Sequence, residues 1–270
     1  RRIMLRDITI GQYYPVNSVL HRLDPRVKLV STLIYIVSLF VFDSIIGYVI
    51  AAIFLASMIK LSQVPFRFMV KGLKPVVVLL CITLFFNLIF TPGEAVFSIW
   101  IITVTREGIQ LAVRMGIRLV FLVIGASLMT LTTTPNQLTD GMERLLKPLN
   151  HIHVPVHEIS MIMSIALRFI PILLDETDKI MKAQTARGAD FESGGLVRKV
   201  KAMVPLLVPL FISAFRRAND LAMAMEARCY HGGEGRTQMK PLIYQKRDYV
   251  AYGIVWAYLA VSIVFRVLGI

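Results

Sequence analysis

Residues 29–59 read LVSTLIYIVSLFVFDSIIGYVIAAIFLASMI, and this apolar run decides the class of fold. It contains one charged residue, Asp43. A bilayer crossing needs about 20 mostly apolar residues, so the run is long enough for two crossings. We therefore expect two membrane helices, over about 27–42 and 44–61, with a tight turn at Asp43.

Three more runs extend this pattern. Pro75 to Gly93 has no charged residue and predicts a third span. Leu119 to Thr139 is also uncharged and, with the turns from Gly108 onward, predicts a fourth, while 249–265 predicts a fifth. The segment 94–107 is apolar but short, and it fits an interfacial hairpin or a re-entrant segment equally well. The expected fold is all-α and polytopic, with about five transmembrane helices.

The composition of the 270 residues agrees with this. Hydrophobic residues make up 56% and charged residues 17%, against about 25% charged in an ordinary soluble chain. A soluble protein could not bury so much apolar surface, and disordered or collagen-like chains are excluded as well. The two cysteines, Cys81 and Cys229, do not suggest a disulfide framework. Residues 1–14 are polar and basic, so we expect no cleavable signal peptide.

Charge is unevenly distributed along the chain. Residues 136–248 hold 16 Lys and Arg and 12 Asp and Glu in 113 positions, whereas the other 157 positions hold 14 and 5. The central block is thus about twice as charged as its flanks (28 in 113 against 19 in 157). We predict a membrane domain over 1–135, a cytoplasmic coupling domain over 136–240, and a C-terminal transmembrane helix within 241–270.

Orientation follows from the basic residues near the span ends. Segments 1–28 and 60–74 are rich in Lys and Arg, so both are expected in the cytoplasm, with the Asp43 turn outside. Five spans then put the central block in the cytoplasm and the C-terminus outside. Arg114 and Arg118 disagree with this scheme, because they fall near the outer end of the fourth span, where they either snorkel outward or face the protein interior.

The central block predicts one short and two long helices. Thr134 and Pro135 resemble an N-cap followed by proline at the first helical position, opening a helix to about Lys147. Two long helices follow, over about 155–186 and 196–228. Each starts apolar and ends polar and rich in Ala or Gly, which allows close helix approach. We interpret them as crossing helices, half in the membrane interface and half in the cytoplasm, whose apolar parts offer surface to another protein.

Both long helices end in related tripeptides, Ala186-Arg187-Gly188 and Ala227-Arg228-Cys229. An arginine at a helix C-terminus has an ordinary role, since it can bind the last free carbonyls. The repetition favours a second interpretation, in which two equivalent arginines enter acidic pockets on two similar subunits. Arginine suits that task because its planar guanidinium binds carboxylates bidentately and stays charged.

Methionine is concentrated in the same block. Flexible methionine surfaces suit partners of varying shape, although ordinary core filling explains them too. The residues considered as a partner-binding or coupling surface are Met161, Met163, Met181, Met203, Met223 and Met225, with Met142 and Met239 nearby in sequence.

Taken together, the chain resembles the transmembrane T component of energy-coupling factor (ECF) transporters along almost its whole length. The second arginine motif departs from the family's usual Ala-Arg-Gly by having Cys229, and Gly232 and Gly233 could supply the turn instead. The matching motifs are His21–Lys28, Thr105–Gly108, Leu131–Pro135, Pro155–Glu158, Leu167–Pro171 and, most strongly, Gln184–Asp190 and Ala224–Tyr230.

The resemblance implies a non-catalytic scaffold in a bacterial or archaeal cell membrane. In that family the two arginine motifs dock on two ABC-type ATPases, which hold ATP and Mg²⁺, while the helices hold one membrane S component. Closure of the ATPases moves the coupling helices and reorients the S component, which delivers a vitamin or a transition-metal ion. By this resemblance the chain binds no cofactor of its own. We expect no nucleic-acid partner either, because the basic residues lie at membrane boundaries rather than on a patch interleaved with aromatic residues.

Other chemistry is weakly supported by the sequence. The phosphate-binding pattern Gly-x-x-x-x-Gly-Lys-Ser/Thr is absent, and the nearest stretch, 232–237, lacks the lysine. The cluster His151, His153, His157 and Glu158 could ligate a metal, but Pro155 interrupts it, which favours a polar linker.

Three further interpretations complete the sequence analysis. Arg168 and Pro171 suggest a kink with an internal partner for the arginine, or a part of the coupling route. Asp24 and Arg26, which flank Pro25, suggest local capping. The alternative functions, a self-sufficient secondary transporter or a membrane-bound enzyme, lack a visible repeat or a catalytic constellation.

Overall fold

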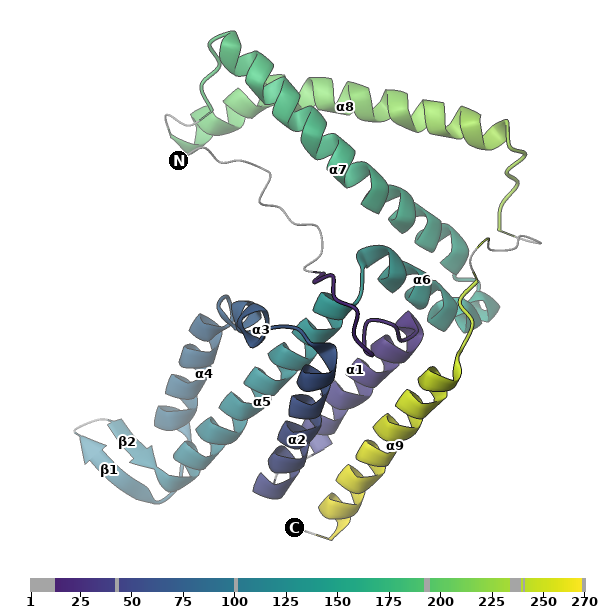
Figure 1. The fold of residues 1–270 in the computed structure, drawn as a ribbon. Helices are drawn as coiled ribbons and strands as arrows, with labels where there is room; N and C mark the ends of the chain where they lie inside the picture. The colour runs from purple at the N-terminus through teal and green to yellow at the C-terminus, as the bar shows by residue number, and fades with distance from the viewer. Residues whose placement is uncertain are drawn as a thin grey trace. The chain divides into compact units, whose positions relative to one another are not determined.

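The computed structural model describes residues 13–41, 44–99, 102–191, 195–233, 239 and 241–268. Within these ranges the chain is mostly helical (Figure 1). The elements are α1 Pro25–Val41, α2 Ile45–Ser62, α3 Phe66–Leu73, α4 Val77–Phe90, β1 Ala95–Ile99, β2 Ile102–Thr105, α5 Arg106–Thr132, α6 Pro135–Leu146, the 3₁₀ helix η2 Lys147–Ile152, α7 Val156–Ala186, α8 Leu196–Glu226 and α9 Lys246–Val267.

The described residues form two compact units. The membrane unit consists of residues within Gly11–Met142 and Leu242–Ile270, and the coupling unit of residues within Glu143–Pro241. The membrane unit contains α1 to α5, most of α6, and α9. The coupling unit is built on α7 and α8.

The expected polytopic all-α fold is confirmed. Four helices, α2, α5, α7 and α9, are long and apolar enough to cross a membrane, and the pair α3 and α4, bent by 59°, would add a fifth. The first expected span is α1, a shorter helix of 17 residues. The expected Asp43 turn lies outside the described residues.

The uncharged run that predicts the fourth span continues to Thr139, but the helix ends before the cap predicted at Thr134. Helix α5 ends at Thr132, because Thr133 is extended and Pro135 begins a new helix. Thr134 accepts a hydrogen bond from the Gln137 amide (3.3 Å), so it caps α6 as the sequence predicts.

The segment between α4 and α5, left open by the sequence, is an antiparallel hairpin of β1 and β2. Thr105 closes its base, because its hydroxyl donates to the Thr91 carbonyl (2.8 Å) and accepts from the Gly108 amide (3.1 Å). The second bond caps the N-terminus of α5. The hairpin therefore leads directly into a capped membrane helix.

The core of the membrane unit lies where α1 packs against α5 and α9. Tyr35, Phe54 and Tyr258 form an aromatic cluster, in which the rings of Phe54 and Tyr258 stack with centroids 4.2 Å apart. Gly125 allows α5 to approach, since a Cβ there would lie 2.6 Å from the Tyr35 ring. On α5 the half-buried Arg118 lies over the ring of Phe40, with 5.2 Å to its centroid, so this arginine faces a neighbouring helix.

A polar network joins the start of α1 to the start of α9. The buried Asp248 carboxylate accepts from the Asp24 amide (2.9 Å) and from the Gln245 amide (2.8 Å). Asp24 in turn binds Arg26 through the backbone amide (2.9 Å) and bidentately through the guanidinium (3.0 and 2.7 Å), which confirms the capping interpretation. Burial opposes ionisation of the Asp24 carboxyl, but its bonds to Arg26 hold its pKa below the usual value. Arg26 also lies 3.7 Å above the Tyr244 ring.

Candidate functional site

The coupling unit contains two helices of 31 residues each, α7 and α8. Their bounds, Val156–Ala186 and Leu196–Glu226, agree closely with the ranges predicted from sequence. Figure 1 shows the two helices crossing near the end of α7 and the first half of α8.

Helix α7 ends in a Schellman motif. The Ala189 amide donates to the Gln184 carbonyl (3.0 Å) and the Gly188 amide to the Thr185 carbonyl (3.0 Å). Gly188 adopts φ +88°, a left-handed conformation that glycine accepts without steric cost. Arg187 is thereby held at the last position before the chain reverses.

Helix α8 ends in the same way. The Tyr230 amide donates to the Met225 carbonyl (3.1 Å) and the Cys229 amide to the Glu226 carbonyl (2.8 Å). The expectation that Gly232 or Gly233 supplies this turn is wrong, because Cys229 itself takes the left-handed conformation, with φ +55°. Arg228 therefore occupies the position that Arg187 occupies on α7.

The two arginines are presented alike. Both are exposed, as are the neighbouring Ala186, Gly188, Ala227 and Cys229. Among the described residues, neither guanidinium has a hydrogen bond or an ion pair. In particular, neither arginine side chain is used to cap the carbonyls of its own helix, which was the ordinary alternative. Both are thus available to another molecule.

The crossing of α7 and α8 fixes how far apart the two arginines lie. Pro209 has no amide hydrogen for the Pro205 carbonyl, and the Gln184 side chain of α7 donates to that carbonyl at 3.4 Å. Met225 follows Pro205 by 20 residues on α8 (225 minus 205), which corresponds to about 30 Å along a helix. The two helix ends are therefore separate sites about 30 Å apart.

A second contact supports the crossing. Arg217 of α8 donates to Glu176 of α7 at 3.4 Å, and both side chains are partly exposed. The two contacts pair residues in opposite order along the chain, so α7 and α8 run antiparallel. A surface ion pair of this kind contributes up to about 1 kcal/mol.

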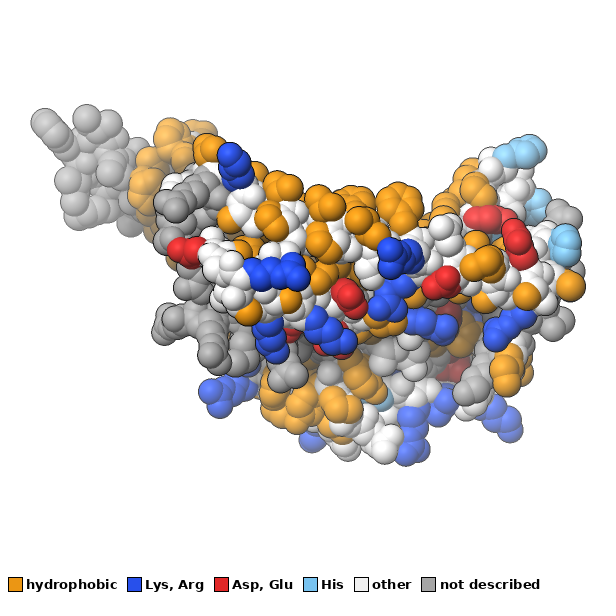
Figure 2. Space-filling view, turned by 90° about the horizontal axis from the view of Figure 1, so that it is seen from above, with side chains coloured by type: hydrophobic (Ala, Val, Ile, Leu, Met, Phe, Trp, Pro, Cys, Tyr) orange, Lys and Arg blue, Asp and Glu red, His pale blue; other side chains and the backbone are white. Residues whose placement is uncertain are grey.

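An apolar stripe on α8 forms the most prominent exposed surface of the coupling unit. Phe211 and Phe215 are 62% and 66% exposed. Figure 2 shows hydrophobic side chains in a band beside a region of mixed charged side chains. The stripe repeats every three or four residues, which places it on one helix face. Its members, which line a shallow groove, are Val204, Leu207, Val208, Phe211, Ile212 and Phe215.

The methionines divide into two groups. Met163, Met203 and Met223 are about half exposed or more, whereas Met161, Met181 and Met225 are partly buried. Sequence reasoning placed adaptable contacts on the methionines and did not single out Phe211 and Phe215. It did interpret the apolar residues 202–215 as part of a submerged helix that offers apolar surface to another protein, and their exposure agrees with that interpretation.

Arg168 differs from its expectation. It is exposed and forms no hydrogen bond or ion pair with another described residue, so the expected internal partner is not found. Pro171, also exposed, lies within the continuous helix α7. A role for both in the coupling route remains a prediction.

Within the histidine cluster, His157 makes a structural contact. His157 Nδ1 lies 3.0 Å from Glu143 Oε1, and the Ser160 hydroxyl donates to the other oxygen of Glu143 (3.1 Å), joining α6 to α7. His153 takes φ +61° where η2 ends. No group of three or more His, Cys, Asp or Glu within the described ranges is arranged to hold a metal ion. The glycine-rich stretch 232–237 falls mostly outside those ranges.

The candidate membrane-spanning helices define the class of protein, a polytopic membrane protein, which here also carries a pair of long exposed helices. Residues 16–239 match the CbiQ family model, described as "Cobalt transport protein". The chain is 55% identical over 266 residues to the Energy-coupling factor transporter transmembrane protein EcfT of Clostridium kluyveri, covering 98% of each chain. Proteins of the same description match from Thermosediminibacter oceani (52%, 92% of this chain and 94% of the relative) and Bacillus subtilis (46%, 91% and 93%).

The chain therefore belongs to the CbiQ/EcfT family of transporter membrane components. The resemblance found in the sequence is confirmed. The family is one of transport components rather than catalytic enzymes, and its members are parts of transporters that contain other subunits.

Proposed function

We propose that the chain is the scaffold of an ECF-type importer, in which Arg187 and Arg228 each dock one ABC-type ATPase subunit. The observation that carries this proposal is the repeated helix end. Two arginines sit at the same position of two Schellman motifs, exposed and about 30 Å apart. Equivalent ends on one rigid helix pair suit two similar partners.

The second part of the proposal concerns the S component. The apolar stripe of α8 leaves Phe211 and Phe215 largely exposed, which is unfavourable in water and favours cover by another apolar surface. Met203 and Met223 add adaptable contacts on the same helix, and Met163 adds one on α7. One membrane S component would occupy this face, and it would carry the vitamin or transition-metal ion.

The third part concerns mechanism and location. ATP and Mg²⁺ would bind in the ATPases, and movement transmitted through Arg187 and Arg228 would shift α7 and α8 under the S component. Arg168 and Pro171 would lie along that route on α7. The coupling unit would face the cytoplasm of a bacterial or archaeal cell, since the basic ends of the membrane helices favour that side.

The test is a co-purification of the full complex. Arg187→Glu with Arg228→Glu should abolish ATPase attachment and uptake, and each single change should weaken attachment by roughly tenfold or more. Lys179→Glu on α7 and Arg216→Glu on α8 are matched controls, because they are exposed and make the same charge change about two turns or more before the helix ends. Normal attachment and uptake by the double variant would overturn the proposal.

A further inference from the structure

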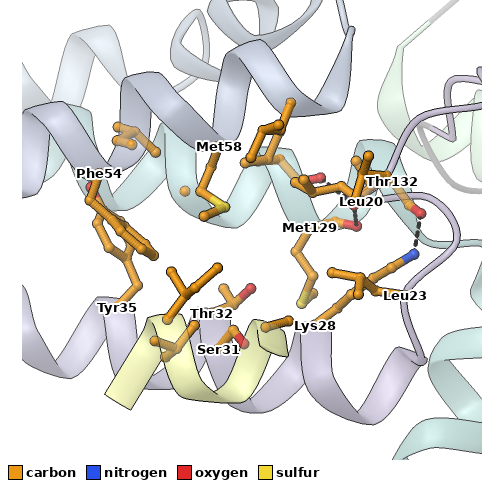
Figure 3. A pocket seen from close by; sticks show the side chains of 18 of the residues that line it. Leu20, Leu23, Lys28, Ser31, Thr32, Tyr35, Phe54, Met58, Met129 and Thr132 are labelled. Carbon is orange, nitrogen blue, oxygen red and sulfur yellow. Dashed lines mark hydrogen bonds between the residues drawn. The ribbon is translucent and has the colours of Figure 1, made fainter. Parts of the chain in front are cut away.

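The membrane unit encloses an apolar cavity that the proposed function does not use. Its volume is about 400 Å³, and it lies among α1, α2, α5 and α9 (Figure 3). Tyr35 and Phe54 close one end, and Leu20, Leu23 and Lys28 lie at the other. Its walls are almost entirely hydrocarbon, as in sites for apolar ligands.

The exposed part of the cavity wall lies mainly on α2 and α9. The lining residues Leu61, Val250 and Ile254 are exposed, whereas Leu55 and Val255, deeper in the wall, are buried. The exposed residues belong to helices that are candidate membrane spans. The exposed part of the wall therefore faces the hydrocarbon that surrounds the helices.

The end opposite the aromatic floor is basic. The buried Lys28 ammonium donates to the carbonyls of His21 (3.1 Å) and Thr132 (2.8 Å), so it is held in place while its stem lines the cavity. Arg247 also lines the cavity but is exposed, and it has no hydrogen bond or ion pair among the described residues. A guanidinium at the mouth of an apolar cavity favours a ligand with a hydrocarbon body and an anionic head.

We propose that this cavity takes one acyl chain of an anionic phospholipid, with the lipid phosphate bound by Arg247. Lys28 and Tyr35 are seven residues apart on α1, so the cavity is about 10 Å deep. One leaflet of the hydrocarbon core is about 15 Å thick, so a chain entering at the basic end would fill the cavity to its aromatic floor.

Other occupants fit less well. A partner helix of about 10 Å diameter could not pass between α2 and α9 at the floor of the cavity, where the Phe54 and Tyr258 rings stack with centroids 4.2 Å apart. A polar solute would lose its hydrogen bonds to water and find few replacements on these walls. A single hydrocarbon chain needs neither the width nor the polar partners.

The experiment uses the complete transporter complex in phosphatidylcholine nanodiscs. A small amount of phosphatidylglycerol carries a diazirine halfway along one acyl chain, and cross-linked peptides are mapped by mass spectrometry. We expect cross-links on the cavity faces of α2 and α9, near Met58 and Ile254. Unlabelled phosphatidylglycerol should remove them, and unlabelled phosphatidylcholine should not.

Two matched pairs of variants test the site. Ala251→Phe narrows the cavity and should reduce these cross-links roughly tenfold, whereas Ala260→Phe, on the exposed face of the same helix, should not. Arg247→Gln should abolish the preference for phosphatidylglycerol over phosphatidylcholine, and Lys246→Gln should preserve it. Because Arg247 is exposed, its substitution tests the headgroup even if Ala251→Phe perturbs folding.

Three outcomes would overturn the proposal. Equal labelling by diazirine phosphatidylglycerol and phosphatidylcholine would mean that only bulk lipid is sampled. Equal labelling by a diazirine fatty acid would remove the role of the phosphate. No labelling in the complete complex, with labelling restored once the S component is removed, would show that the cavity face is a protein interface.

Discussion

The Asp248 carboxylate accepts a hydrogen bond from the backbone amide of Asp24, 2.9 Å away in space and 224 residues away in sequence. Asp248 is 1% exposed, and its other oxygen accepts from the Gln245 amide. One buried side chain thus caps α9 and holds the first membrane helix beside the last.

Replacing Asp248 by alanine should destabilise the membrane unit by about 2–4 kcal/mol, because two backbone donors would lose their acceptor. Asp248→Asn keeps one acceptor oxygen and should have an intermediate effect. Thermal unfolding of the purified complex measures both changes. Asp220→Ala, an exposed change on α8, is the control, and equal melting temperatures for all three variants would contradict this account.

Cys229→Gly should stabilise the end of α8 by about 1 kcal/mol, because a left-handed conformation strains every residue with a Cβ. ATPase attachment should be unchanged, since Arg228 keeps its place. Hydrogen–deuterium exchange of the last turn of α8 measures the effect. Ala224→Gly, within the same helix, should have the opposite sign and cost about 1 kcal/mol. Faster exchange in Cys229→Gly would be inconsistent with the strain.

Glu176→Arg should weaken the packing of α7 against α8, at a cost in free energy of at most about 1 kcal/mol. The change places a second positive charge next to Arg217, where the two charges repel. The double exchange Glu176→Arg with Arg217→Glu should restore most of the loss. Distances between spin labels on α7 and α8 measure the crossing. If the double exchange changes the distance between the spin labels as much as the sum of the two single changes, the ion pair does not hold the helices together.

Acidification should destabilise the start of the chain through His21. Its ring lies between the Ser18 hydroxyl (2.6 Å) and the Tyr14 carbonyl (2.9 Å). Burial, aided by the Lys28 charge and opposed by the bond to Tyr14, lowers the pKa of His21 below its usual 6.5. A lowered pKa means that the folded state binds the proton less well than the unfolded state. The stabilisation is therefore complete above pH 6.5 and declines as the pH falls below it.

Melting temperatures from pH 7.5 to 5 check this dependence. The wild-type protein should lose stability over this range, and His21→Gln should lose less. His151→Gln, an exposed change, should retain the wild-type slope. Identical slopes in all three proteins would exclude His21 as the cause.

Local patterns in the sequence predicted much of this fold. Apolar runs located the membrane helices, and proline, glycine and N-cap residues located the ends of α6 and α7, because those signals act within one or two helical turns. The same reasoning failed at Cys229, where a residue without special backbone freedom took the position expected for glycine. It also failed at Arg168, where a tertiary partner was expected.

The candidate site was only partly predictable for a related reason. Arg187 and Arg228 were found because their motif repeats along the chain. Their spacing was not, because it depends on the contact between Gln184 and Pro205. The exposure of the stripe around Phe211 also depends on which face of α8 packs against α7. Hydrophobicity alone does not distinguish a helix face that contacts lipid from one that binds another protein.

The antiparallel crossing has a geometric consequence for α8. The end of α7 meets α8 at Pro205, and Arg228 follows the end of α8. The stretch of α8 from Pro205 to Met225 therefore sets the distance between the two arginines along the helix and the angle between the directions in which they point. Inserting a whole turn would shift one arginine by about 5.4 Å and nearly preserve its direction, whereas inserting two residues would rotate it by roughly 200°. The length of α8 thus encodes the relative orientation of whatever binds its two ends.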